Sequence, residues 1–391
     1  MINIINSEQA EKIDKLSTTS NLISEKKLID NAGKAIAYHI IEKVLDPFHQ
    51  DFLCIAGFGK NGLDAIVCNY YLKINNINSQ LLILNPKKIN PDYLTRYLPS
   101  NEFYGINDKI NYTQFSWIVE GIFGTGLNRD IEGATLDVIK LLNTRKNIIS
   151  IDISSGVYAD TGKITNIAVK SETTISFAFP KAGHFLSDGF SKRGKLFVYP
   201  IGHSDSKIDS CMKLIEKKDV LKFLKPIDSD THKYTKGKIL SLSGSASYSG
   251  AAILSSKASV YSGTGIIKQL IPLSLHKILS KNDEVIDVLI DDSKNGFLSL
   301  TNYKELESYF NWPDSFVLGP GLSDHKEAIK LTKKILANFK GNCILDASGF
   351  LSFNKNFDFS NLPKKTILTP HYGELSKILN ISVSDLKNNT I

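Results

Sequence analysis

The sequence predicts a two-domain α/β protein in which each domain is built on a largely parallel β-sheet. The chain has 391 residues, a length that suggests two or three domains. Short apolar runs alternate with stretches of helical periodicity, and this alternation implies right-handed crossovers and a parallel sheet covered on both faces. Between residues 202 and 230 the alternation weakens into Ser, Asp and Lys, as is typical of a connection between domains.

The first domain is expected over residues 1–210. One long amphipathic helix is predicted over residues 20–44, where apolar side chains recur at helical spacing up to a stop at Asp46-Pro47. Short apolar runs after it predict six buried strands. These strands are Phe52 to Ala56, Leu81 to Leu84, Trp117 to Val119, Ile148 to Ile151, Thr174 to Phe177 and Leu196 to Val198.

A linker is expected over residues 211–230, and the second domain over residues 231–391. The second domain shows the same alternation, with a helix predicted from Gly250 to Tyr261 and one more after Thr369-Pro370-His371. No repeat of fixed period relates it to the first domain. Its predicted strands are Lys238 to Leu242, Gly265 to Leu270, Phe316 to Leu318, Cys343 to Leu345 and Thr366 to Leu368.

Composition excludes several classes of protein. Hydrophobic residues make up 42% and charged residues 22%, which is a globular balance. The net charge of +7 is spread along the chain with no basic block, so we expect no nucleic-acid partner. The four cysteines form no C-x-x-C pair, which argues against a disulfide framework and structural zinc. Without a signal peptide or a long apolar run, we expect a cytoplasmic protein with no membrane partner.

The first predicted strand runs into a glycine-rich loop, Gly57-Phe58-Gly59-Lys60-Asn61-Gly62, which satisfies G-x-G-x-x-G. A strand before it and a helix after it are the context in which backbone N–H groups meet a phosphate. A hydride-transferring site should also carry an acidic residue after the second strand, where this chain has Asn85-Pro86. An ordinary dehydrogenase is therefore disfavoured. The alternative is a glycine turn needed only for close packing.

Two more loops follow strands of the same sheet: Gly124 to Arg129, and Asp152 to Gly156. Loops at the carboxyl ends of parallel strands meet in the ligand crevice. There, Asn61, Glu120 and Ser155 offer hard oxygen ligands for a cation. Asp64 and Asp152 are candidates for holding hydroxyls or moving protons, and the alternative for each is a loop or N-cap hydrogen bond.

Lys181 ends another strand on this edge, where it is a candidate for pairing with phosphate or for acid–base work. Its alternative is a solvated loop lysine, and His184 is interpreted as a surface or turn histidine. In the second domain, small-residue loops after three strands predict a pocket for a flat or phosphorylated ligand. These loops are Ser243 to Ala252, Leu318 to Leu322 and Leu368 to Glu374, and the Pro-Gly and Thr-Pro turns have a purely structural alternative.

Taken in order, these motifs resemble a known family. Leu28 to Gly33, Gly57 to Asp64, Phe123 to Arg129, Asp152 to Gly162 and Thr174 to Gly183 resemble the Rossmann-like epimerase domain of the NAD(P)H-hydrate repair enzymes. His232 to Ala252, Leu318 to Leu322, Leu345 to Ala347 and Leu368 to Glu374 resemble the ribokinase-like dehydratase domain fused to it in bifunctional forms. The resemblance implies a Rossmann-like three-layer αβα domain followed by an incomplete ribokinase-like α/β domain.

The resemblance also implies a function, the repair of nicotinamide cofactors. The reduced nicotinamide ring adds water at C6 to give R and S hydrates; the epimerase interconverts them, and the dehydratase uses ADP or ATP with Mg²⁺ to expel water from the S form. Asp152 and Lys181 are our candidates for the proton donor and acceptor of epimerisation, and K⁺ would be held by Asn61, Glu120 and Ser155. The hydrate site of the second domain would include Ala251, Gly321 and His371. The residues that would contact the dinucleotide in the first domain are Lys60, Asn61, Gly62, Leu63, Asp64, Gly124, Thr125, Gly126, Leu127, Asn128, Arg129 and Asp130.

The chain departs from the family pattern at several positions. Lys60 stands in place of an Asn, and Leu63 stands in place of a Gly at a point where the backbone would approach the ligand. Glu120 replaces the usual Asp. The chain also ends before the family's nucleotide-binding segments, so we expect a fragment of a longer protein, a degraded gene or a second chain, and an exposed apolar face on residues 231–391.

Two alternatives remain open at this stage. One is a small-molecule kinase of the ribokinase class, and the other is a non-catalytic nucleotide- or RNA-binding scaffold built on the epimerase fold. The expected partner is a small-molecule substrate, the hydrated NADH or NADPH. A homo-oligomer is possible through the long N-terminal helix, although such a helix more often covers its own sheet.

Overall fold

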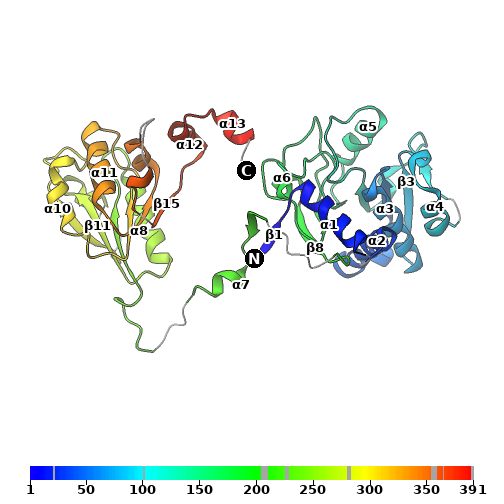
Figure 1. The fold of residues 1–391 in the computed structure, drawn as a ribbon, viewed down its shortest axis with the longest axis horizontal. Helices are drawn as coiled ribbons and strands as arrows, with labels where there is room; N and C mark the ends of the chain where they lie inside the picture. The colour runs from blue at the N-terminus through cyan, green and yellow to red at the C-terminus, as the bar shows by residue number, and fades with distance from the viewer. Residues whose placement is uncertain are drawn as a thin grey trace. The chain divides into compact units, whose positions relative to one another are not determined.

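The computed structural model describes residues 1–20, 23–99, 102–203, 210–224, 229–279, 283–353, 359–363 and 365–388. The chain divides into two compact units, Met1–Leu224 and Lys225–Thr390, and each is considered by itself (Figure 1). Among the described residues, no helix is both long enough and apolar enough to cross a membrane.

The first unit is built on a seven-stranded, wholly parallel sheet with the strand order β4-β3-β2-β5-β6-β7-β8. All six predicted strands are present, two of them with the predicted bounds, and short β4 extends one edge. The order reverses between β2 and β5, which makes this edge of the sheet a topological switch point. The strands are β2 (Phe52–Ala56), β3 (Ser79–Ile83), β4 (Tyr104–Gly105), β5 (Trp117–Gly121), β6 (Ile148–Ile151), β7 (Thr173–Phe177) and β8 (Lys195–Tyr199).

Helices cover both faces of this sheet, giving three layers (Figure 1). Successive strand residues point to opposite faces, so Cys54 packs in the cluster beneath α2 and α3, whereas Leu53 and Ile55 pack in the cluster beneath α5. The predicted long helix is α2, which begins after the N-cap Ser24; residues 21 and 22 lie outside the described residues. The helices are α1 (Ser7–Thr19), α2 (Glu25–Lys43), α3 (Lys60–Ile74), α4 (Pro91–Tyr97), α5 (Gly133–Leu142) and α6 (Gly189–Lys192).

The sequence did not predict how the start of the chain is used. β1 (Ile2–Ile4) pairs antiparallel with β9 (Met212–Leu214), and the amino group of Met1 lies 2.5 Å from Asp219 Oδ2 in α7 (Lys217–Leu221). Residues 211–224 therefore belong to the first unit. We predicted a linker over residues 211–230. The first unit instead extends to Leu224, because Met212–Leu214 pairs with the N-terminal strand β1.

The second unit contains a six-stranded parallel sheet with the order β12-β11-β10-β13-β14-β15. All five predicted strands are present, and β12 is additional. Its strands are β10 (Lys238–Leu242), β11 (Ile266–Pro272), β12 (Ile286–Ile290), β13 (Ser315–Leu318), β14 (Asn342–Leu345) and β15 (Lys365–Leu368). Its helices are α8 (Ser249–Tyr261), α9 (His276–Leu279), α10 (Tyr303–Glu307), α11 (Lys326–Asn338), α12 (Tyr372–Leu379) and α13 (Val383–Asn388).

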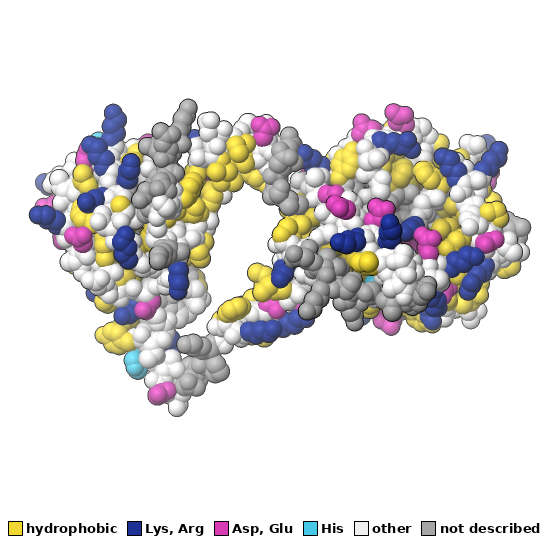
Figure 2. All heavy atoms as spheres, viewed as in Figure 1, with side chains coloured by type: hydrophobic (Ala, Val, Ile, Leu, Met, Phe, Trp, Pro, Cys, Tyr) yellow, Lys and Arg dark blue, Asp and Glu magenta, His cyan; other side chains and the backbone are white. Residues whose placement is uncertain are grey.

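Apolar side chains are exposed at the β15 end of this second sheet. Ile367 on the edge strand β15 is 61% exposed, and none of the residues of α12 is buried. Figure 2 shows hydrophobic side chains gathered along the segment that runs from β15 to α12. The expectation of an exposed apolar face on residues 231–391 agrees with this surface.

Candidate functional site

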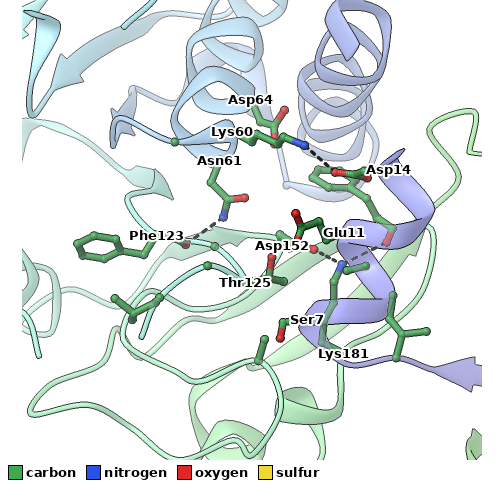
Figure 3. Close-up of a pocket in the computed structure, with 18 of the residues that line it drawn as sticks. Ser7, Glu11, Asp14, Lys60, Asn61, Asp64, Phe123, Thr125, Asp152 and Lys181 are labelled. Carbon is green, nitrogen blue, oxygen red and sulfur yellow. Dashed lines mark hydrogen bonds and ion pairs between the residues drawn. The ribbon is translucent and has the colours of Figure 1, made fainter. Parts of the chain in front are cut away.

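The first unit holds a pocket of about 1170 Å³ at the carboxyl ends of its strands. Loops after β2, β5, β6 and β7 form its floor and sides, and α1 forms a further wall (Figure 3). A cavity of this volume is large enough for a dinucleotide-sized ligand. The three loops predicted to converge at this edge therefore do converge.

The glycine loop after β2 serves both packing and access. A Cβ on Gly62 would lie 2.1 Å from the carbonyl oxygen of Gly57, and a Cβ on Gly57 would lie 2.0 Å from that of Ile122, so both glycines are required by close backbone packing. Gly59 lines the pocket, and nothing lies within 4 Å of the position its Cβ would take. Close packing therefore explains Gly57 and Gly62, whereas Gly59 leaves open space at the pocket wall.

Asp152 and Lys181 form a buried ion pair on the pocket wall (Figure 3). Lys181 Nζ donates to Asp152 Oδ1, to Ser176 Oγ at 3.1 Å and to the carbonyl oxygen of Phe177 at 3.3 Å, which uses all three hydrogens of an ammonium group. Ser176 Oγ also donates to Asp152 Oδ1 at 3.0 Å. Asp152 itself has φ +61°, a left-handed conformation that is uncommon outside glycine and clusters at functional sites.

His184 is a buried part of this cluster, with 1% of its surface exposed, so the surface interpretation was wrong, whereas the residue does end a short turn, Ala182–His184. Burial and the nearby Lys181 charge lower the pKa of His184 to about 4, so its ring is neutral at physiological pH. The sequence gave no sign of this burial, because the two hydrogen-bond partners of the ring, backbone groups of Lys181 and Asp152, come together only in the folded domain.

Glu120 lies behind the pocket and is fully buried. Its carboxylate accepts hydrogen bonds from the hydroxyls of Ser150 and Ser155 and from the backbone N–H groups of Ser155 and Ile122. Burial raises the pKa of Glu120 to about 7 despite these bonds. Asn61 Nδ2 donates to the carbonyl oxygens of Phe123 (3.0 Å) and Ile151 (2.8 Å). Because Ser155 Oγ also bonds to Phe123, the three predicted metal ligands share one cluster of oxygen atoms.

Lys60 ties α1 to α3 at the mouth of the pocket. Its Nζ lies 2.9 Å from Asp14 Oδ2 and 3.3 Å from Glu25 Oε1, and His203 Nε2 lies 2.8 Å from Asp14 Oδ1. Burial opposes the charge on Asp14, but the hydrogen bonds from His203 and Lys60 outweigh it and lower the pKa of this carboxyl. The positive charge of Lys60 is thereby engaged by carboxylates of the protein.

Asp64 is a further carboxyl group that lines the pocket, together with Asp152. Burial, together with the negative charges of Asp152 and Asp14, raises the pKa of Asp64 well above its usual range. Its protonated form is thereby favoured, which makes Asp64 a candidate hydrogen-bond donor to a ligand.

In the second unit, the loops after β10 and β13 are joined. Ser245 Oγ donates to the carbonyl oxygen of Gly321 at 2.9 Å, and a Cβ on Gly321 would lie 2.6 Å from that of Ala251 at the start of α8. His371 is the N-cap of α12; its Nδ1 accepts from Gly373 N at 3.0 Å, and its side chain is 74% exposed. Ala251 and Gly321 are thus neighbours, and His371 lies on an exposed helix start.

Comparisons with known proteins match both halves of the chain. Residues 25–183 match the model described as YjeF-related protein N-terminus, and residues 239–390 match the model described as NAD(P)H-hydrate dehydratase. The bifunctional NAD(P)H-hydrate repair enzymes of Thermofilum pendens and Dictyoglomus turgidum are each 27% identical over 99% of this chain, and the match covers 74% and 78% of their lengths. The chain belongs to the bifunctional NAD(P)H-hydrate repair enzyme family.

Solved structures show weaker likeness to each half of this repair enzyme. A yeast protein, ynu0, is 20% identical, with a TM-score of 0.44, over 59% of this chain and 97% of its own. The ADP/ATP-dependent NAD(P)H-hydrate dehydratase of Bacillus subtilis is 23% identical, with a TM-score of 0.36, over 45% of this chain and 58% of its own. The family assignment rests on the sequence matches.

Most predicted contact residues of the repair enzyme's first domain line the pocket, and three do not. Gly62 lies beneath the loop, Leu63 packs against the core cluster of α2 and α3, and Asp130 Oδ1 accepts from Asn166 N at 3.3 Å. The helix register directs the side chain of Leu63 toward the core, so it does not crowd the pocket, contrary to the expectation from the family pattern. The predicted residues that line the pocket are Lys60, Asn61, Asp64, Gly124, Thr125, Gly126, Leu127, Asn128, Arg129, Asp152 and Lys181.

Sequence reasoning missed the contribution of α1. This helix lines the pocket with Glu8, Glu11 and Asp14. The sequence signal that could have predicted the helix is the capping box that Asn6 forms with Gln9 at its start. His203, which lines the pocket beyond β8, was also missed because its partner Asp14 is far away in the sequence.

Proposed function

We propose that the first domain of this repair enzyme interconverts the R and S hydrates of NADH and NADPH, with Asp152 and Lys181 as its catalytic residues. The observation that carries the proposal is the buried Asp152–Lys181 pair on the wall of a dinucleotide-sized pocket. Buried ion pairs in a cleft next to glycine-rich loops are candidate acid–base sites.

The chemistry of the substrate defines what this pair must do. Hydration at C6 leaves a carbon that bears a hydroxyl group and the ring nitrogen. Removal of the hydroxyl proton and cleavage of the C6–N1 bond, with its electron pair going to a protonated N1, gives an open-chain aldehyde. Rotation about the C5–C6 bond and closure on the other face, by the reverse transfers, gives the other epimer. The reaction therefore needs a base near the hydroxyl and an acid near N1.

We assign the base to Asp152 and the acid to Lys181. The carboxylate of Asp152 is paired with the ammonium group of Lys181 and lines the pocket, where it can reach the hydroxyl group of the substrate. Of the three hydrogen bonds of Lys181, the one to Phe177 O is the longest, at 3.3 Å, so this is the hydrogen most easily transferred to a ligand. Asp64, whose protonated form is favoured by burial, would donate to the substrate carboxamide or hydroxyl oxygens.

We also propose that Asn61, Glu120 and Ser155 hold a potassium ion. The side chains of all three residues carry oxygen atoms, and Glu120 is a buried carboxyl group whose described partners are neutral hydroxyl and amide groups, so a monovalent cation would favour its ionised form. The ion would supply fixed positive charge behind the glycine loops. Replacement of K⁺ by a large organic cation should weaken hydrate binding, and full activity without K⁺ would argue against the site.

For the second domain we propose the dehydration of the S hydrate, with ADP or ATP and Mg²⁺ phosphorylating the added hydroxyl group, and with Ala251, Gly321 and His371 contacting the substrate. The family match over residues 239–390 supports this role. Recovery of reduced nicotinamide absorbance when the S hydrate is mixed with the chain, ATP and Mg²⁺ tests it. The cytoplasmic location, the absence of nucleic-acid and membrane partners and the possible homo-oligomer stay predictions.

The decisive experiment follows the R hydrate chromatographically, without ADP or ATP, against a control without enzyme. We expect the wild-type chain to accelerate formation of the S hydrate, and Asp152→Asn to remove the acceleration. Asp137→Asn makes the same chemical change on the exposed face of α5 and should leave the rate intact. A folded wild-type chain that gives no acceleration would contradict the proposal and favour a binding protein.

A further inference from the structure

His184 connects the backbone of the two proposed catalytic residues. The backbone N–H of Lys181 donates to His184 Nδ1 at 3.0 Å. An amide N–H is only a donor, so Nδ1 is unprotonated and the ring proton lies on Nε2. Nε2 in turn donates to the backbone carbonyl oxygen of Asp152 at 2.9 Å. One neutral imidazole therefore bridges the loop after β6 and the loop after β7.

The two segments that His184 joins are distant in the sequence and have no regular pairing at this point. Asp152 leaves the sheet in the left-handed conformation, with φ +61°. Lys181 starts the short turn Ala182–His184, in which His184 N donates to Lys181 O at 3.0 Å. A left-handed aspartate persists only where its surroundings hold it. The imidazole supplies one of these restraints directly at the carbonyl group of Asp152.

The surroundings hold His184 itself in one position. Arg193 Nε donates to the carbonyl oxygen of His184 at 2.7 Å. Ile5 brackets the turn from the other side, because its N–H donates to Pro180 O and its carbonyl accepts from Ala182 N. His184 does not line the pocket, so it reaches a bound substrate only through Asp152 and Lys181.

We propose that His184 is a positioning residue for epimerisation, which sets the separation and orientation of Asp152 and Lys181 through their backbones. This inference rests on the proposed function of the first domain. It predicts that loss of the imidazole slows the chemical step while the binding of the hydrate is largely preserved, because the pocket walls keep their side chains.

Three substitutions of His184 in the full chain separate its two hydrogen bonds. His184→Ala removes both. In His184→Asn the side-chain oxygen can take the place of Nδ1 and accept from Lys181, and in His184→Gln the side-chain NH₂ group can take the place of Nε2 and donate to Asp152. We expect His184→Ala to lower kcat about 100-fold, as for a misplacement of about 1 Å, with KM changed less than about threefold. The Asn and Gln variants should each recover part of kcat.

His39 provides the matched control. It is also a buried, neutral histidine of the first domain, with 4% exposure, a pKa lowered to about 4 by burial, and one side-chain hydrogen bond, to Tyr199. It lies outside the pocket. His39→Ala should perturb packing to a similar extent and leave kcat within about twofold of the wild-type value.

The outcomes separate the inference from the proposed function. A wild-type chain that epimerises the hydrate, with a folded His184→Ala variant of unchanged kcat, would overturn the inference alone. An equal loss of kcat in His39→Ala would also overturn it, because general loosening would then explain the effect. If His184→Ala does not fold, the Asn and Gln variants decide: wild-type kcat in both refutes the role, and reduced kcat with preserved KM supports it. A wild-type chain without activity contradicts the proposed function itself.

Discussion

The buried pair of Asp152 and Lys181 should be energetically coupled, and Lys181→Met tests this coupling. The side chains of Lys181 and Asp152 are only 4% and 11% exposed. Removal of one partner of a buried ion pair leaves an uncompensated charge and costs about 3–5 kcal/mol. Because Asp152 faces the pocket, where water reaches it, we expect the lower end, about 3 kcal/mol of unfolding free energy.

The two tryptophans of the chain, Trp117 in β5 and Trp312 in the second unit, allow the measurement within the whole protein. In a Trp312→Phe background, fluorescence of Trp117 reports the first domain alone. At about 2 kcal/mol per molar urea, a loss of 3 kcal/mol lowers the urea midpoint by about 1.5 M. Lys140→Met breaks the exposed pair with Asp137 on α5, and this control should cost less than about 0.5 kcal/mol.

The double variant Asp152→Asn, Lys181→Met decides whether the cost comes from the charge. With both charges removed, no uncompensated charge stays buried, so the double variant should be more stable than Lys181→Met, with a coupling of about 1–3 kcal/mol. Single effects that add without coupling would refute the reasoning, because each side chain would then contribute only its own packing.

Two further predictions concern stability. Burial lowers the pKa values of His39 and His184 to about 4, so these two rings favour unfolding as the pH falls below 6.5, whereas the raised pKa values of Glu120 and Asp64 act in the opposite direction. In His39→Phe one of the two rings is lost, so between pH 6.5 and pH 4 its melting temperature should fall less than that of the wild type; parallel profiles in thermal unfolding would contradict this prediction. Gly62→Ala places a Cβ 2.1 Å from the oxygen of Gly57, so we expect a loss of about 2 kcal/mol or more, seen as a lower melting temperature. Gly59→Ala has open space and φ −94°, and should melt as the wild type does while weakening hydrate binding.

The strands that the sequence predicted best lie inside the two sheets and not at their edges. Phe52–Ala56, Ile148–Ile151 and Lys238–Leu242 have the predicted bounds, because parallel strands covered on both faces are largely continuous apolar runs. The strand missed in the second unit, β12, is half exposed and lies at the sheet edge, so its alternation is weak. The β1–β9 ribbon was missed because three-residue strands depend on a partner some 200 residues away, which no local pattern indicates.

The same distinction holds within the site. Glycine loops and the residues that directly follow strands were found because topology alone brings the carboxyl ends of parallel strands together. His184, His203 and the acidic face of α1 were not found, since their positions depend on side-chain contacts between distant segments. Local sequence therefore located the crevice, and tertiary packing determined which additional side chains face it.

Lys60 shows how this packing changes the meaning of a departure from the family pattern. A lysine in the glycine loop suggests a contact with the dinucleotide phosphates, yet its charge is engaged by Asp14 and Glu25. With Glu8 and Glu11, α1 presents an acidic wall to the pocket. Because such a wall repels phosphate groups, we expect the dinucleotide phosphates to bind beside the positively charged Arg129, which also lines the pocket.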